Sequence, residues 1–168
     1  RRAASVKKYL IDKYGIDTTN EWIVQRTGIE ARHFAGDGVG PADMGYEAAQ
    51  VALQRAGLTA QDVDFVIFAT LSPEHAFPGS GCYLNAKLGI PGVPALDIRN
   101  QCSGFVYGLS VADAWIRTGT YRRVLLVGSE VHSTGLDVTT RGRDVSVIFG
   151  DGAGAALLEA TDDPGRGV

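Results

Sequence analysis

Apolar positions recur every three to four residues in several parts of the chain, and this spacing predicts four helices. The predicted helices span residues 6–14, 42–56, 80–88 and 103–117. Gly15 and Gly57 follow the first two, as is typical of helices that end in a left-handed turn. In the second helix, five positions follow the helical spacing: Met44, Ala48, Val51, Ala52 and Arg55.

Nearly continuous runs of branched and aromatic residues predict β-strands between these helices. The two clearest runs are DFVIFAT at residues 64–70 and RVLLVGS at residues 123–129, and we expect both strands to be covered on two faces. Further strands are predicted at residues 93–98, 145–149 and 153–158. Because strands and helices alternate along the chain, the pattern predicts a layered α/β sheet.

The helix predicted at residues 103–117 is apolar around its whole circumference. Its charged residues are Asp113 and Arg117, and both lie in its second half. A helix that is apolar on every side is a buried helix. We therefore expect an architecture in which two α/β layers pack on this central helix.

Composition and charge exclude several classes of protein. The chain has 168 residues, 45% of them apolar, and a net charge of −3, which is ordinary for a globular domain and leaves no basic face for nucleic acid or anionic lipid. No apolar run approaches the roughly 18 residues that cross a bilayer. We expect no targeting segment at the N-terminus. Two cysteines are too few for a secreted disulfide framework, so we expect a reduced, cytoplasmic protein.

Cys102 is the candidate nucleophile. It follows the predicted strand at residues 93–98 and stands at the start of the apolar helix, in the run DIRNQCSGFVYG. The unpaired amides and the positive end of the helix dipole at such a position favour thiolate over thiol. Ser103 and Gly104 leave room for a thioester to approach. From position alone, a small buried hydrophobic cysteine is an equally good interpretation.

Other residues with chemical potential have structural interpretations. Cys82 lies inside a predicted helix, where packing is the default, and neither a disulfide nor a metal site with Cys102 is expected. His75 lies in a loop, and nothing places it at the cysteine. Ser80 is expected to cap a helix. The run FGDGAGAALL at residues 149–158 lacks the lysine of a phosphate loop and is expected to form a tight turn between two strands.

Four segments, taken together, resemble the N-terminal half of the β-ketoacyl-acyl-carrier-protein synthase III family. They are TNEWIVQRTGIEARHF, ATLSPEHAFPG, DIRNQCSGFVYGLSVADAWI and DVTTRGRDVSVIFGDGAGAALL, and the similarity covers nearly all of residues 18–158. Several long motifs in register are more specific than any one of them. The resemblance implies a thiolase-like fold of α-β-α-β-α layers made from two similar halves, with the cysteine on a central buried helix.

The resemblance also implies an activity. Cys102 would take an acyl group from an acyl-CoA, and the carbanion from decarboxylated malonyl-acyl carrier protein would attack it, in fatty-acid or polyketide biosynthesis. Trp22 would stack on the CoA adenine with Arg141 on its other side, and Arg26 would assist with the CoA phosphates. Phe77 would line an acyl pocket across a dimer interface. Acyl-CoA is a substrate here, and no cofactor or metal is expected.

The resemblance is incomplete. The family's second half supplies a His and an Asn that drive decarboxylation, and its first strand has no apolar counterpart before the first helix here. We therefore expect residues 1–168 to be a partial N-terminal half-domain that needs the C-terminal half of the same enzyme, with the complete enzyme a homodimer that binds neither nucleic acid nor membrane. The alternatives are a related acyltransferase or natural-product synthase of the same fold, and a non-catalytic assembly partner.

Overall fold

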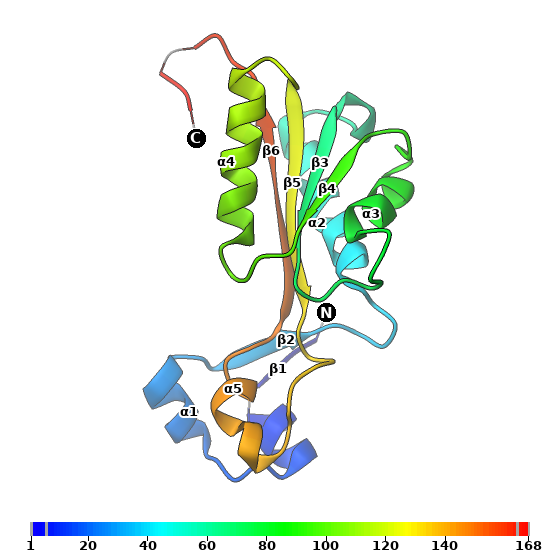
Figure 1. Ribbon diagram of the computed structural model, residues 1–168. Helices are drawn as coiled ribbons and strands as arrows, with labels where there is room; N and C mark the ends of the chain where they lie inside the picture. Colours follow the sequence, from blue (N-terminus) through cyan, green and yellow to red (C-terminus); the bar gives the residue numbers. More distant parts are fainter. Residues whose placement is uncertain (1, 6, 164, 168) are drawn as a thin grey trace. The chain divides into compact units, whose positions relative to one another are not determined.

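The computed structural model describes residues 2–5, 7–163 and 165–167. The chain divides into two compact units, each described by itself: unit 1 comprises Arg1–Val39 and Val131–Gly152, and unit 2 comprises Gly40–Glu130 and Ala153–Val168. Figure 1 labels the helices and strands of both units. None of the helices in the described residues has the length and hydrophobicity of a transmembrane span.

Unit 2 is built on a four-stranded sheet with the strand order β4-β3-β5-β6. The strands are β3 (Phe65–Ala69), β4 (Ala95–Ile98), β5 (Arg123–Val131) and β6 (Asp151–Glu159). β3 runs parallel to both of its neighbours, with Val66 opposite Ala95 on one side and Leu125 on the other. The predicted α/β sheet and four of its five predicted strands are thus confirmed.

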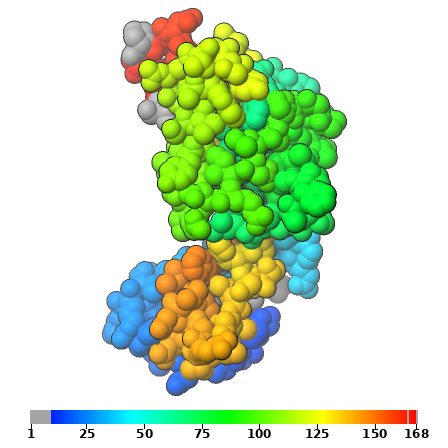
Figure 2. Space-filling view, viewed as in Figure 1, coloured from blue at the N-terminus to red at the C-terminus, as the bar shows by residue number. Residues whose placement is uncertain are grey.

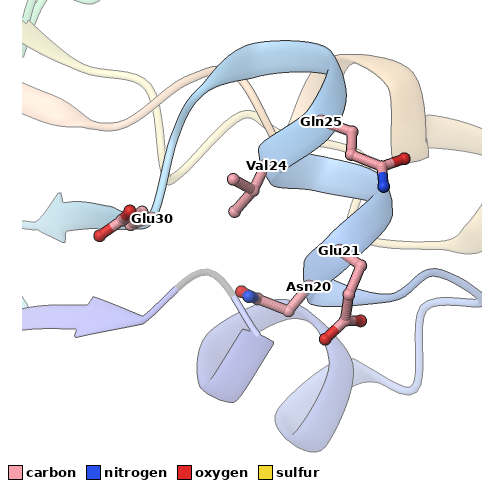
Figure 3. Close-up of a pocket in the computed structure, with 5 residues that line it drawn as sticks. All are labelled: Asn20, Glu21, Val24, Gln25 and Glu30. Atoms are coloured by element: carbon pink, nitrogen blue, oxygen red, sulfur yellow. The ribbon is translucent and has the colours of Figure 1, made fainter.

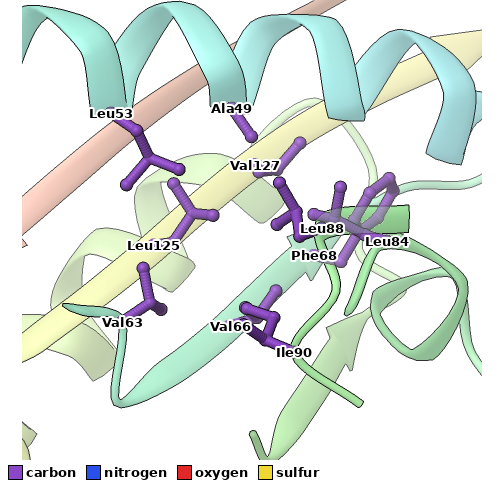
Figure 4. Close-up of a cluster of buried hydrophobic side chains, with 10 residues drawn as sticks. All are labelled: Ala49, Leu53, Val63, Val66, Phe68, Leu84, Leu88, Ile90, Leu125 and Val127. Atoms are coloured by element: carbon purple, nitrogen blue, oxygen red, sulfur yellow. The ribbon is translucent and has the colours of Figure 1, made fainter. Parts of the chain in front are cut away.

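Helices cover both faces of this sheet, and for this reason every residue of β3 is buried. On one face, α2 (Pro41–Ala56) and α3 (Ser80–Leu88) pack on alternate strand residues. Figure 4 shows this core, which contains Ala49, Leu53, Val63, Val66, Phe68, Leu84, Leu88, Ile90, Leu125 and Val127. On the other face, α4 (Gly104–Arg117) packs on the remaining strand positions, among them Phe65 and Ile67.

Helix α2 matches its predicted range and ends at Gly57 in a left-handed turn with a φ of 69°. Its buried face differs from the predicted spacing, however. Met44, Ala49 and Leu53 are buried, whereas Val51 is 46% exposed. The spacing alone could not select the face, because alanines on both sides of the helix fit a helical repeat.

Helix α4 is not buried on all sides, which corrects the sequence prediction. Gly104, Gly108 and Ala112 face the sheet and are buried, but Val106 and Tyr107 are 61% and 54% exposed. In Figure 2 the yellow-green atoms of α4 lie on the visible surface. The described residues provide one sheet for this helix to pack on, so its opposite apolar face stays in contact with solvent.

Unit 1 contains a two-stranded antiparallel sheet and short helical segments. β1 (Arg2–Ser5) pairs with β2 (Ala31–Phe34). The helical segments are the π-helical η1 (Lys7–Asp12), α1 (Asn20–Thr27), the 3₁₀ turn η3 (Thr140–Gly142) and α5 (Arg143–Ser146). Their buried side chains form a separate core of Leu10, Ile16, Ile23 and Val147.

The structure refines the helix expected near the start of the chain and adds a short strand that the sequence did not predict. The helix predicted at residues 6–14 is observed as η1 and the helical residues 13 and 14 that follow it, while Val6 lies outside the described residues. A strand, β1, precedes this helix. The sequence pattern did not reveal β1 because it is short and its sequence, RAAS, contains no apolar run.

The predicted strand at residues 145–149 is wrong. These residues, all described, contain the end of α5 and the connection to β6 instead. Ser146 and Val147 are adjacent and both buried, which does not fit the alternating exposure of a strand. The tight turn predicted at residues 149–158 is therefore wrong as well: residues 149 and 150 belong to the connection from α5, and residues 151–158 lie within β6.

The aspartate of the glycine run has a structural role in unit 1. Asp151 is buried, and its carboxylate accepts hydrogen bonds from Ala35 N at 2.7 Å, Ser133 N at 2.9 Å and Ser133 Oγ at 2.6 Å. These bonds hold together segments that are more than 100 residues apart in sequence.

Candidate functional site

Cys102 lies in the turn between β4 and α4, where the sequence placed it. It is exposed and its thiol is free, so the interpretation as a buried hydrophobic residue is wrong. Two hydrogen bonds fix the turn around it. Gly104 N donates to Gln101 O at 2.9 Å, and Asn100 Nδ2 donates to Ser103 Oγ at 2.8 Å.

The turn stands at the carboxyl ends of two parallel strands. A Cβ on Gly104 would lie 3.4 Å from Ala69 Cβ and 3.8 Å from Ile98 Cγ2, and these two residues end β3 and β4. Ligands of parallel α/β sheets characteristically bind beyond this edge. Cys102 is thus an exposed nucleophile candidate at the edge of the sheet where ligands are expected.

Phe77 lies in the segment between β3 and α3, which also leaves the sheet at the carboxyl end of β3. Its side chain is 85% exposed, the largest exposure among the large apolar residues identified as exposed. An exposed phenylalanine on a loop is a typical contact residue for a ligand or a partner. Its predicted role in an acyl pocket stays a prediction.

Three carboxylates that the sequence analysis missed hold this segment. Glu130 accepts hydrogen bonds from Leu71 N at 2.8 Å and from Ser72 Oγ at 2.6 Å. Asp97, on β4, accepts hydrogen bonds from the first two amides of α3, and Glu74 lies within the segment itself. A carboxylate in a strand or loop does not change the spacing of apolar residues, so the sequence pattern does not reveal its role. Only its position near the start of a predicted helix could have indicated that it caps that helix.

Burial raises the pKa of Asp97. The amides of Gly81 and Ser80 act in the opposite direction, because they donate hydrogen bonds to its charged form. The charge of Glu74 raises this pKa further, and Arg99 lowers it. The net effect is a carboxyl group whose pKa lies above the ordinary aspartate value.

Three residues in or near this segment differ in part from their expected roles: Ser80, Cys82 and His75. Ser80 is buried as the first residue of α3, and Gly79 occupies the cap position, so the serine is not the predicted cap. Cys82 is exposed rather than packed in the core, since α3 turns it to solvent. The ring of His75 lies 4.9 Å from that of Tyr83, between centroids, so it packs against α3.

Trp22 is half-buried on α1 in unit 1. Its amide donates to the cap residue Thr19, at 3.1 Å from Oγ1, which fixes the start of the helix. Two guanidinium groups contact its ring: Arg26 Cζ is 4.3 Å and Arg143 Cζ is 4.7 Å from the ring centroid. Trp22 and Arg26 are thus in contact, four residues apart on α1, and their role in one binding site stays a prediction.

Arg141 does not contact this tryptophan. Its Nε and Nη2 each lie 3.1 Å from Asp137 Oδ2, and its side chain is 91% exposed. Hydrogen bonds from Thr139, and then from Arg141, lower the pKa of Asp137. Arg143, which the sequence analysis did not select, occupies the place beside the indole because the short helix α5 begins at that residue.

A surface pocket of about 510 Å³ lies beside α1 (Figure 3). It is lined by Asn20, Glu21, Val24, Gln25 and Glu30. Two carboxylates in its wall disfavour a phosphate-bearing ligand. Trp22 and Arg26, which lie on the same helix, are not among these lining residues.

No three His, Cys, Asp or Glu side chains within the described residues come close enough together to hold a metal ion. The two cysteines are both free thiols.

Comparison with known proteins gives consistent results. A family model described as 3-oxoacyl-[acyl-carrier-protein (ACP)] synthase III matches residues 96–168. The β-ketoacyl-[acyl-carrier-protein] synthase III 1 of Vibrio vulnificus (strain YJ016) is 48% identical over 150 residues, which are 89% of this chain and 47% of that protein. The chain therefore spans about half the length of this relative.

Solved structures agree with the sequence matches. The crystal structure of 3-oxoacyl-[acyl-carrier-protein] synthase III from Aquifex aeolicus VF5 has a TM-score of 0.89 and 37% identity, covering 97% of this chain and 51% of that one. The priming β-ketosynthase of the R1128 polyketide pathway has a TM-score of 0.89 and 34% identity. The similarity covers 98% of this chain and 48% of that one. The thiolase-like α/β fold implied by the resemblance is confirmed, for about half of its length.

Proposed function

Because this chain belongs to the 3-oxoacyl-[acyl-carrier-protein] synthase III family, we propose that it is the acyl-accepting half of a β-ketoacyl-acyl-carrier-protein synthase. In this proposal the Cys102 thiolate attacks the carbonyl carbon of an acyl-CoA, and the CoA thiolate leaves. Malonyl-acyl carrier protein then loses CO₂, and its carbanion attacks the acyl-enzyme. The β-ketoacyl product leaves on the carrier, and the cysteine thiolate is regenerated.

The observation that carries this proposal is the placement of Cys102. The thiol is exposed, stands two residues before a 14-residue helix, and lies beyond the carboxyl ends of two parallel strands. An acyl group arriving there would meet small neighbours, Ser103 and Gly104.

CoA recognition is assigned to unit 1. Trp22 would stack on the adenine, with Arg141 on its other side, and Arg26 would assist with the phosphates. The contact between Arg26 and Trp22 supports a shared role for these two residues. Arg141 would have to leave Asp137, and an exposed ion pair of this kind stabilises the fold only slightly.

The remaining parts of the proposal concern partners. The C-terminal half of the same enzyme would supply the His and Asn that drive decarboxylation, and would cover the apolar outer face of α4. Phe77 would line the acyl pocket across the interface of a homodimer. The enzyme would act in the cytoplasm, in fatty-acid or polyketide biosynthesis, without a cofactor or metal.

Product formation tests the proposal. The polypeptide that carries this sequence is incubated with radiolabelled acetyl-CoA and malonyl-acyl carrier protein, and the labelled β-ketoacyl carrier is quantified. We expect turnover in the unmodified protein, a loss of at least about 10³-fold in Cys102→Ala, and no loss in Cys82→Ala. A protein that takes up no acyl group from any acyl-CoA would instead be a non-catalytic assembly partner.

A further inference from the structure

The segment that carries Phe77 is closed by a side-chain hydrogen bond. Ser80 Oγ donates to Glu74 Oε2 at 2.7 Å, so the bond joins the two ends of the five-residue stretch 75–79. Phe77 is the middle residue of this stretch and is largely exposed. Closing a short loop removes most of its conformational freedom, so this bond limits the directions in which the phenylalanine ring can point.

The same carboxylate ties the segment to α2. Glu74 Oε1 accepts a hydrogen bond from Ala42 N, in the first turn of that helix, where a negative charge is favourable. Gly40 makes this approach possible, because a Cβ at that position would lie 2.6 Å from Glu74 Cγ. Glu74 therefore connects three elements: its own segment, the start of α2 and the first residue of α3.

Two other carboxylates fix the ends of the segment. Glu130, at the end of β5, holds the amides of Leu71 and Ser72 at 2.8 and 3.1 Å. Asp97 holds the amides of Ser80 and Gly81 at 2.6 and 2.9 Å. These bonds anchor the segment where it leaves β3 and where it enters α3, but they lie outside the stretch that presents Phe77.

We propose that Glu74 is a positioning residue for acyl-chain selection: its carboxylate closes the stretch 75–79 onto α2 and α3 and so sets where Phe77 is presented. We assign it no contact with the acyl chain, because it acts through the phenylalanine. This inference rests on the proposed function, in which Phe77 lines the acyl pocket.

Hydrogen exchange of two peptides tests the positioning without any assay of activity: residues 40–46, which contain the Ala42 amide that donates to Glu74, and residues 71–81. Glu74→Ala removes both acceptor oxygens, and Glu74→Gln keeps one of them. Ser80→Ala removes a single donor and is the variant that least disturbs folding. Glu47→Ala is the matched control, because it deletes an exposed carboxylate from the middle of α2. We expect exchange about tenfold faster in Glu74→Ala, a smaller increase in the other two variants, and none in the control. Unchanged exchange in Glu74→Ala would overturn the inference.

Acyl-chain selectivity tests the consequence for the reaction. The ratio of kcat/KM for acetyl-CoA to that for hexanoyl-CoA is measured on the polypeptide that carries this sequence, with Phe77→Ala as the reference for a lost ring. We expect Glu74→Ala to shift this ratio in the same direction as Phe77→Ala, by about threefold or more, and Glu74→Gln to shift it less.

The two measurements separate the inference from the proposed function. If Phe77→Ala shifts the ratio and Glu74→Ala does not, Glu74 is only structural and the inference is wrong. If Phe77→Ala leaves the ratio unchanged, the acyl role of Phe77 fails, and the selectivity role of Glu74 fails with it. Hydrogen exchange then still shows whether Glu74 holds the segment.

Discussion

At the indole of Trp22, two guanidinium groups lie where a flat ligand would stack. Arg26 and Arg143 both have Cζ within 5 Å of the ring centroid, at 4.3 and 4.7 Å. Stacking of a base on an aromatic side chain is worth about 1–3 kcal/mol. The ring should therefore contribute to the binding of CoA rather than to the chemical step.

Trp22→Ala should raise the KM for acyl-CoA by about tenfold and leave kcat nearly unchanged, because 1.4 kcal/mol of binding energy corresponds to a factor of ten. Steady-state kinetics and calorimetric titration with CoA measure the two effects. Arg55→Ala, an exposed arginine at the end of α2, is the control for loss of surface packing or charge. Equal CoA affinity in Trp22→Ala and the unmodified protein would show that the indole is only a structural anchor.

The raised pKa of Asp97 predicts a pH dependence of stability. A carboxyl group that holds its proton more tightly in the folded state stabilises that state below its unfolded pKa, near 3.8, and this contribution is lost as pH rises through the folded pKa. Urea unfolding between about pH 4 and 7 should therefore show the unmodified protein losing free energy of unfolding relative to Asp97→Asn as pH rises. A relative gain over the same range would contradict the assigned shift.

Residue roles could be predicted from sequence only where a residue has a fixed place in an element. Cys102 was correctly placed because a strand, a turn and a helix follow each other in its sequence. Arg141 and Arg143 are two residues apart in a short, irregular region, and no periodicity tells which of them reaches Trp22. Glu74 and Asp97 were missed because their partners are backbone amides of other elements.

Among the elements, α4 lies close to the sheet at a glycine. A Cβ on Gly108 would lie 2.5 Å from Leu126 Cδ1 and 3.3 Å from Ile67 Cγ2, and both side chains are fully buried. The glycine therefore sets the distance between the helix and strands β3 and β5. Any side chain here would have to displace packed core residues.

Gly108→Ala should lower the free energy of unfolding by about 1–2 kcal/mol, because overpacking outweighs the better helix propensity of alanine. Ser110→Ala, on the exposed face of the same helix, should change it by less than about 0.5 kcal/mol. Denaturant unfolding of the two variants measures this difference. A Gly108→Ala protein as stable as the parent would mean that α4 packs more loosely than the structure shows.

The elements that sequence predicts well are strands buried on both faces and helices that cover them with one face. β3, β5, α2 and α3 follow their predicted ranges because a buried strand gives a continuous apolar run and a covering helix gives a regular repeat. The predicted strand at residues 145–149 failed for the opposite reason. Some of its apolar residues are exposed to solvent, and another lies in the small core of unit 1. The number of apolar residues therefore does not indicate whether the segment is a strand or a helix.

In the molecule as a whole, the outer face of α4 is an apolar surface that the described residues leave exposed. The prediction of a helix buried on all sides was made from composition, and the structure covers only one side. The chain also spans about half the length of the relatives it matches. Together these observations are the reason for assigning the cover of α4 to a C-terminal half in the proposed function.

The exposed face of α4 should make the 168-residue chain self-associate when it is produced alone. Apolar surface of this kind is removed from water by contact with another copy. Sedimentation velocity should show a concentration-dependent increase in mass, and replacing Val106 and Tyr107 by aspartate should reduce it, while Glu47→Ala should not. If the chain stays monomeric at all concentrations, the apolar face of α4 gives no reason to expect a partner that covers it.

Acylation of Cys102 is the step on which the proposed function depends, and mapping of the acyl group shows whether it occurs. The polypeptide that carries this sequence is incubated with acetyl-CoA, digested, and analysed by mass spectrometry, with exposed Cys82 as the internal reference. We expect one added acetyl group on the peptide that contains Cys102, and none on the peptide that contains Cys82. An acetyl group found only on Cys82, or acylation that persists in Cys102→Ala, would contradict this expectation.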